Sequence, residues 1–178
     1  MSALAAETKA KFSMYQACVP TITRALANLV AVLEIGAAHA EAKKIDPSVL
    51  VNSRLYPDMF PLAKQVQIAS DVAKIGTSRI AQVEPPKYED NETTFAELIE
   101  RLRKTIAHLK TLKPEQFDDG TRTVTFPVQG ESKTWPGARY LYGRVLPNVF
   151  FHCTTTYNIL RHNGVEIGKA DFLGPLDG

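Results

Sequence analysis

The chain has 178 residues, with 21 lysines and arginines against 19 aspartates and glutamates, and 44% of its residues are hydrophobic. These ordinary values exclude an intrinsically disordered chain and a collagen-like fibre, and two cysteines are too few for a disulfide scaffold. A net charge of +2 argues against a dedicated nucleic-acid-binding protein, which normally carries a basic stripe. The length fits one domain over residues 1–178, large enough to bury a full core without metals or disulfides.

No segment has the features of a targeting or membrane signal. Residues 1–11 lack the apolar centre of a secretion signal. Polar and charged residues interrupt the most apolar stretch, residues 18–38. Its longest unbroken apolar run is therefore well short of the roughly 18 apolar residues needed to cross a bilayer. The sequence therefore predicts a cytoplasmic protein with no membrane partner, in which Cys18 and Cys153 are free, buried thiols.

The first two helices are predicted from apolar residues spaced three and four positions apart. The first stripe extends from Phe12 to Gly36, and Pro20 within it predicts a kink or a break near residues 18–19. A short turn begins at Asp46-Pro47, and the second helix then follows Asp58, its expected N-cap.

The second helix carries an extra apolar stripe and ends before Pro85-Pro86. Its main stripe includes Leu62 and Val66, and the extra stripe consists of Ile68, Val72 and Ile75. A helix that is apolar on two sides is expected to contact two neighbouring helices or a second subunit.

The third helix is expected to begin at Thr93 or Thr94, because Thr94 and Glu97 have the spacing of a capping box, and Pro114 closes it. A small hairpin is predicted next, from the Thr- and Val-rich segment 121–128 and the returning segment 132–135.

The fourth helix is predicted from about Pro136 to His162 and stops at Asn163-Gly164, and the tail after it lacks helical periodicity. This element order predicts an all-α helical bundle with a small hairpin or irregular insertion before the last helix.

His152 is the most informative single residue. At about 100° per residue it lies in the middle of the apolar stripe of the fourth helix. A histidine there needs a hydrogen-bond partner, because burying a polar group without one costs a few kcal/mol. It is either a ligand or acid–base group inside the bundle, or a core histidine satisfied by a neighbouring helix or by water.

Metal-ligand spacing is absent around this histidine. A catalytic zinc normally takes three protein ligands, but the position one turn after His152 is Thr156, a poor zinc ligand, and the sequence contains no H-x-x-x-H. On the second helix, Asp71 and Lys74 lie one turn apart, where they could line a polar cavity or form a solvated ion pair.

Several longer segments resemble one protein family, DUF1993, a branch of the DinB/YfiT-like helical bundles. They are residues 54–62, 65–74, 89–98, 146–164 and 168–174. The resemblance implies an up-down-down-up four-helix bundle that is usually a homodimer.

Many proteins of the DinB-like superfamily bind zinc or nickel through three histidines, one on the second helix and two in an H-x-x-x-H on the last. By this resemblance, His152 matches the first histidine of the last helix, Thr156 stands at the second, and Ser70 or Asp71 replaces the one on the second helix. No cofactor is therefore predicted; if zinc or nickel does bind, His152 and Asp71 are its candidate ligands.

The leading hypothesis is a cytoplasmic homodimer without a catalytic metal that binds a small molecule in an interior polar pocket. Its candidate lining residues are His152, Thr156, Asp71 and Tyr56. One alternative is an enzyme of the superfamily, either a thiol-dependent S-transferase or isomerase, or a degenerate metal-dependent hydrolase or transferase. Another is a homodimeric structural or interaction module. The sequence identifies no catalytic residue and does not decide whether the protein is an enzyme.

Overall fold

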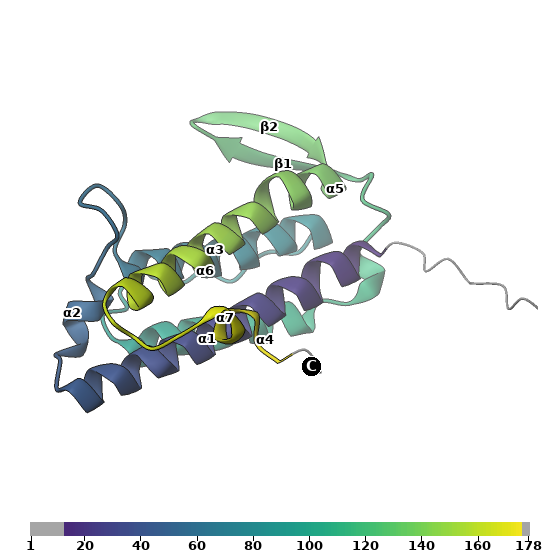
Figure 1. The fold of residues 1–178 in the computed structure, drawn as a ribbon. Helices are drawn as coiled ribbons and strands as arrows, with labels where there is room; N and C mark the ends of the chain where they lie inside the picture. The colour runs from purple at the N-terminus through teal and green to yellow at the C-terminus, as the bar shows by residue number, and fades with distance from the viewer. Residues whose placement is uncertain (1–12, 176–178) are drawn as a thin grey trace, which may run out of the picture.

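The computed structural model describes residues 13–175 and contains four long helices packed lengthwise (Figure 1). These are α1 (Met14–Lys43), α3 (Leu62–Ala81), α4 (Phe95–Thr111) and α6 (Leu146–His162). Hydrogen bonds join Ser70 to Thr105 and Ser78 to His108, so α3 and α4 progress in the same direction. The expected all-α, up-down-down-up bundle is confirmed, with residues 82–94 as the long crossover between its two parallel central helices.

The predicted apolar stripes form one core between the helices. Ile22, Leu26 and Leu33 of α1 are fully buried, as are Leu98 and Leu102 of α4. The capping box is present as well: the Thr94 hydroxyl accepts from the Glu97 N–H at 3.3 Å, and the Glu97 carboxylate accepts from the Thr94 N–H at 3.0 Å. The helix therefore begins at the predicted boundary.

Pro20 does not break α1, contrary to one of the two expectations. Proline has no N–H, so the carbonyl of Gln16 loses its helical partner. The hydroxyl of Thr21 donates to that carbonyl at 3.4 Å, and the helix continues to Lys43. Phe12, the first residue of the predicted stripe, lies outside the described residues.

By length and mean hydropathy, 1.5 over its most apolar window, α1 is a candidate membrane-spanning helix among the described residues. A core helix of a bundle passes the same test, and ten residues of α1 are buried against the rest of the protein.

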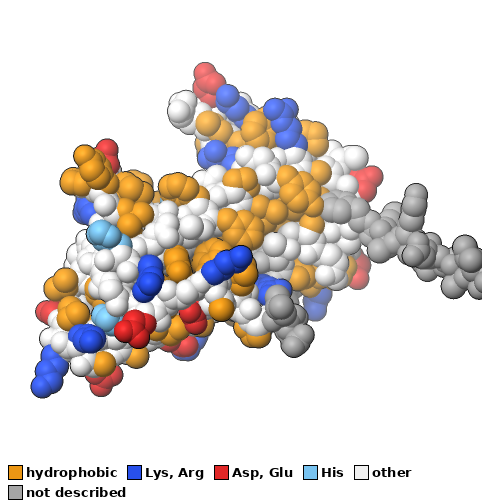
Figure 2. Space-filling view, in the orientation of Figure 1, with side chains coloured by type: hydrophobic (Ala, Val, Ile, Leu, Met, Phe, Trp, Pro, Cys, Tyr) orange, Lys and Arg blue, Asp and Glu red, His pale blue; other side chains and the backbone are white. Residues whose placement is uncertain are grey.

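The second long helix begins later than expected. Asp46 caps the short α2 (Pro47–Val51) as predicted, but α3 starts at Leu62, and its N-cap is Pro61 rather than Asp58. The residue before a proline is sterically disfavoured in helical geometry, so Phe60 cannot extend the helix backwards. Residues 52–61 instead form a projecting loop, whose tip carries hydrophobic side chains (Figures 1 and 2).

A short 3-10 turn, η1 (Pro114–Gln116), leads from α4 to the predicted hairpin. β1 (Thr123–Val128) pairs antiparallel with β2 (Glu131–Pro136), and the ring of Phe126 packs against Trp135 at a centroid distance of 5.1 Å.

The predicted last helix is three consecutive pieces, α5 (Gly137–Tyr140), a π-helical turn (Leu141–Val145) and α6. The tail is not wholly irregular, because α7 (Lys169–Leu173) follows. It docks on α1, where the Asn28 amide donates to the Leu173 carbonyl at 2.7 Å and Arg24 donates to the same carbonyl at 3.3 Å. Sequence periodicity could not reveal a helix of five residues.

Candidate functional site

The π-turn, Leu141–Val145, is explained by the proline that follows it. Pro147 cannot donate to the carbonyl four residues earlier, and its ring crowds that carbonyl, so regular α-geometry is disfavoured there. The Asn148 side-chain amide donates to the Arg144 carbonyl at 2.7 Å and holds the widened turn.

Gly76 of α3 allows this turn to lie close to the neighbouring helix. A Cβ at Gly76 would stand 2.7 Å from one methyl carbon of Val145 and 2.8 Å from the other. Such separations are too short for packed carbon atoms, so a side chain at residue 76 would push the π-turn away from α3.

A cavity of about 270 Å³ lies beside this contact. It is bounded by α3, β1, α5, the π-turn and the start of α6, and its lining includes Asp71, Val72, Ile75, Arg79, Pro127, Tyr140, Arg144 and Asn148. A second cavity of about 570 Å³ shares Asp71, Ile75 and Arg79 and continues toward residues 83–88. We call these two neighbouring cavities the α3 groove.

Two guanidinium groups face the groove without a carboxylate partner. Arg79 Nη1 lies 3.3 Å from the hydroxyl oxygen of Tyr140, to which it donates, and the Arg144 guanidinium carbon lies 5.5 Å from the centre of the Phe126 ring. Neither arginine forms an ion pair with any carboxylate in residues 13–175. The carboxylate of Asp71, which lines both cavities, is already bound to two other cations.

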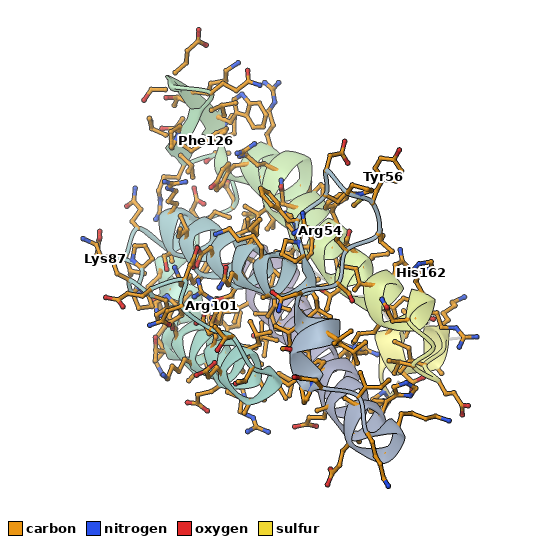
Figure 3. All side chains as sticks on the ribbon, turned by 90° about the vertical axis from the view of Figure 1, so that its left-hand side faces the viewer. Arg54, Tyr56, Lys87, Arg101, Phe126 and His162 are labelled. Carbon is orange, nitrogen blue, oxygen red and sulfur yellow. The ribbon has the colours of Figure 1, made fainter. Side chains whose placement is uncertain are left out.

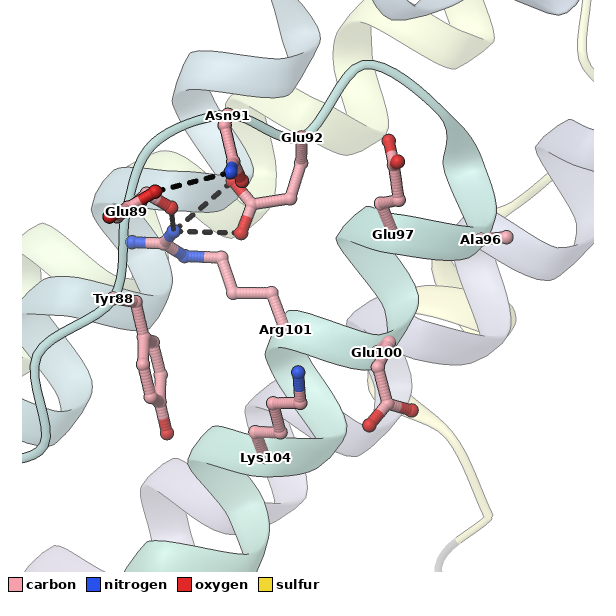
Figure 4. A pocket seen from close by; sticks show the side chains of 9 residues that line it. All are labelled: Tyr88, Glu89, Asn91, Glu92, Ala96, Glu97, Glu100, Arg101 and Lys104. Carbon is pink, nitrogen blue, oxygen red and sulfur yellow. Dashed lines mark hydrogen bonds and ion pairs between the residues drawn. The ribbon is translucent and has the colours of Figure 1, made fainter.

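Those cations are Lys74 and Arg101, both almost completely buried. Asp71 Oδ1 accepts from Lys74 Nζ at 3.0 Å and from Arg101 Nη2 at 2.6 Å. Arg101 Nη1 also donates to the Glu92 carboxylate and to the Glu89 carbonyl, each at 2.9 Å (Figure 4). Asp71 and Lys74 were expected either to line a polar cavity or to form a solvated ion pair. They form the ion pair within a larger, half-buried network, and both line the larger cavity of the groove.

This Arg101 network fastens the crossover to the two parallel helices. Burial alone would lower the pKa of Arg101, but the hydrogen bond and charge of Glu92 and the charge of Asp71 hold it above its ordinary value. A cavity of about 560 Å³ adjoins the network and is lined by four glutamates (Figure 4). Its deepest cation, Arg101, has its donors occupied by the protein itself, so the network is structural.

His152 is buried and has a defined partner that the sequence did not indicate. Its Nδ1 lies 2.7 Å from Oε1 of Gln65 on α3, and the Gln65 amide nitrogen donates to the Phe60 carbonyl at 3.0 Å. Because that bond fixes which end of the amide faces the imidazole, Nδ1 of the neutral histidine carries the proton and donates to Gln65. Burial lowers the pKa of His152, which keeps the ring neutral.

The residues around His152 do not fit the three-histidine metal site that the resemblance implies. The Thr156 hydroxyl donates to the backbone carbonyl of His152 at 2.9 Å, and the α3 side chain that reaches the imidazole is an amide. Amide and hydroxyl groups are poor ligands for zinc or nickel. Within residues 13–175, no three histidine, cysteine or acidic side chains are grouped where they could hold a metal ion.

The four residues predicted to share one pocket are separated. His152 and Thr156 lie together on α6, whereas Asp71 contacts the Arg101 network and borders the groove. Tyr56 is 66% exposed on the projecting loop, and Figure 3 shows it well apart from Arg101. Asp71 follows Gln65 by six positions, about 240° around the helix, so the two face different neighbours.

Comparison with known proteins agrees with this architecture. A family model described as domain of unknown function, DUF1993, matches residues 14–173. The chain belongs to the DUF1993 family. The DUF1993 chain is also similar to a solved structure, the crystal structure of a DinB family member protein from Shewanella denitrificans, with 42% sequence identity and a TM-score of 0.85. The match covers 92% of this chain and 93% of that one. No curated protein matches the sequence.

Proposed function

We propose that this DUF1993 protein binds a small molecule without a metal, and that the ligand occupies the α3 groove beside the π-turn. The observation that carries the proposal is the 270 Å³ cavity at the point where the last helix leaves α-geometry. Helix segments of this kind occur frequently at functional sites. The lining combines apolar walls from Val72 and Ile75 with a few converging polar groups, which is typical of ligand sites.

This proposal moves the ligand away from the histidine. The Nδ1 atom of His152 is bonded to Gln65, and the neighbouring Thr156 hydroxyl bonds to the backbone. Asp71 is the one member of the expected pocket that lines the groove.

Amide NMR spectra of the full chain test this site, with phenylacetate, phenylacetamide and reduced glutathione as probes. We expect at least one probe to shift signals of groove residues at millimolar concentration or below. The variant Ile75→Trp should abolish the shifts because residue 75 lines both cavities and a larger side chain would fill them, whereas Val49→Trp, at an exposed position of α2, should not.

Shifts that map elsewhere, or no shift from any probe, would contradict the proposal. Glutathione binding in the groove would favour a thiol-dependent transferase as the activity of the site.

We also propose that the protein is a cytoplasmic homodimer. Phe60 and Phe151 are each more than half exposed and flank the Gln65–His152 pair, because Gln65 bonds to the Phe60 carbonyl and the Phe151 ring contacts the imidazole edge-on at 5.2 Å. Aromatic side chains are enriched in protein interfaces. Light scattering should give the mass of two chains, and Phe151→Arg should give one; a monomeric wild type would contradict this proposal.

A further inference from the structure

We infer that the ligand of the α3 groove is a small organic anion, a carboxylate or phosphate on an apolar stem, bound between Arg79 and Arg144. This inference rests on the proposed function, and it names the chemistry that the site recognises. Its basis is the pair of guanidinium groups that line one cavity and pair with no carboxylate of residues 13–175.

The charges around the groove favour an anion. Arg79 and Arg144 line the same cavity, so their like charges repel one another, whereas Lys74, which lines the larger cavity, is paired with Asp71. Two carboxylates line the groove: that of Asp71 is shared by Lys74 and Arg101 at 3.0 and 2.6 Å, and that of Glu84 is exposed and lines only the larger cavity. A bound anion would relieve the repulsion between the two arginines and accept charge-assisted hydrogen bonds from both.

The Tyr140 hydroxyl supplies a further hydrogen-bond donor beside Arg79. The Tyr140 hydroxyl accepts from Arg79, so its own hydrogen can be donated to a ligand oxygen. Tyr140 is itself buried, and its ring stacks at a tilt on Phe126 with a centroid distance of 4.6 Å. The hydroxyl is thereby held in one place, which favours a ligand group of fixed geometry.

The apolar walls and the volume limit the size of the ligand. Val72, Ile75 and Val145 give the cavity an apolar side, and its volume of about 270 Å³ lies just below the roughly 300–1,000 Å³ of pockets that hold drug-sized ligands. A single aromatic ring or a short branched chain fits this space together with one anionic group. A second anionic group would approach the Asp71 carboxylate, so the favoured ligand carries its charge at one end.

Calorimetric titration of the full chain at low salt tests the inference. The probes are phenylacetate, phenyl phosphate and their uncharged counterpart phenylacetamide. We expect an anion to bind about tenfold or more tightly than phenylacetamide, since a hydrogen bond to a charged group contributes at least that much discrimination. The comparison of the two anions decides between a carboxylate and a phosphate.

Matched arginine variants locate the binding. Arg144→Met and Arg79→Met should each reduce the preference for the anion several-fold, because they weaken the binding of the anion more than that of phenylacetamide. Arg139→Met is the control, because Arg139 is exposed, stacks on Trp135 at 4.4 Å and does not line the groove. Melting temperatures of the variants confirm that each is folded.

The outcomes separate the two proposals. Equal binding of phenylacetate and phenylacetamide, both lost in Ile75→Trp, would overturn the anion inference and leave the groove as a ligand site. Preference for the anion that survives replacement of both arginines would place the anion elsewhere and also overturn the inference. Binding of neither anion nor amide would overturn the proposed function together with the inference.

Discussion

Replacing Arg101 by methionine should destabilise the protein by about 3 kcal/mol. Removing one partner of a buried ion pair typically costs about 3–5 kcal/mol, because the other charge stays buried and unpaired. Here the Glu92 side chain is 11% exposed and the Ser70 hydroxyl is buried, so both would lose a partner that water cannot fully replace. The Asp71 and Asp90 side chains are about a third exposed and can rehydrate, which places the effect at the lower end of the range.

Arg103 provides the matched control, on the same helix. It pairs with Glu34 at 2.8 Å, a length similar to that of the Arg101–Glu92 contact, but the two side chains are 58% and 49% exposed. An exposed pair contributes about 0–1 kcal/mol, so Arg103→Met should have little effect. Urea unfolding measures both, and the Arg101 variant should also melt about 6–12 °C lower. If the two variants differ by less than about 1 kcal/mol, the Arg101 network is not what holds the crossover in place.

Three further changes probe packing, titration and capping. Gly76→Ala should cost about 1–3 kcal/mol and be partly rescued by Val145→Ala, whereas Gly143→Ala, whose Cβ would meet nothing nearer than 3.7 Å, should fold normally in a thermal melt. Burial lowers the pKa of His152 below its ordinary value near 6.5, so its contribution to stability is complete above about pH 6.5 and is lost as the pH falls through the lower pKa. Urea unfolding between about pH 5 and pH 8 should show a shallower acid loss in His152→Gln, and an unchanged slope would contradict this reading. Thr94→Ala should lower the free energy of unfolding in urea by about 1 kcal/mol through loss of the cap. Thr93→Ala should lower it by less, because the Thr93 hydroxyl donates only to the Glu97 side chain.

The helices were predictable because a helix that buries one face needs apolar residues every three or four positions, and the sequence has this spacing. The stripe that includes Ile22, Leu26 and Leu33 was read correctly, and so was the capping box at Thr94. The errors came from prolines, whose effect depends on a neighbour. The Thr21 hydroxyl donates to the carbonyl that Pro20 leaves unpaired, so α1 continues past this proline. At Pro61 the preceding residue is disfavoured in helical geometry, so α3 starts only at Leu62.

The site was harder to predict, because it depends on contacts between distant positions. The sequence predicts that Arg79 and Arg144 lie on helices, but it does not predict whether a carboxylate lies within reach of either side chain. The pairing of Gln65 with His152 joins residues 87 positions apart, and no local pattern encodes it. One signal was available: Pro147 inside the last predicted helix indicates a local departure from α-geometry, which is where the groove lies.

His152 and the α3 groove both lie between α3 and α6 but at different places, so substitutions can test them separately. Arg144 precedes His152 by eight residues, roughly 12 Å of helix, and the imidazole Nδ1 is bonded to the Gln65 side chain, which does not line the groove. We therefore expect a ligand held by Arg79 and Arg144 not to contact His152. Replacing His152 should change stability and its pH dependence while leaving anion binding intact, and replacing Arg144 should do the reverse. The residue most conspicuous in the sequence would then belong to the core, and the chemistry to two arginines that look unremarkable in it.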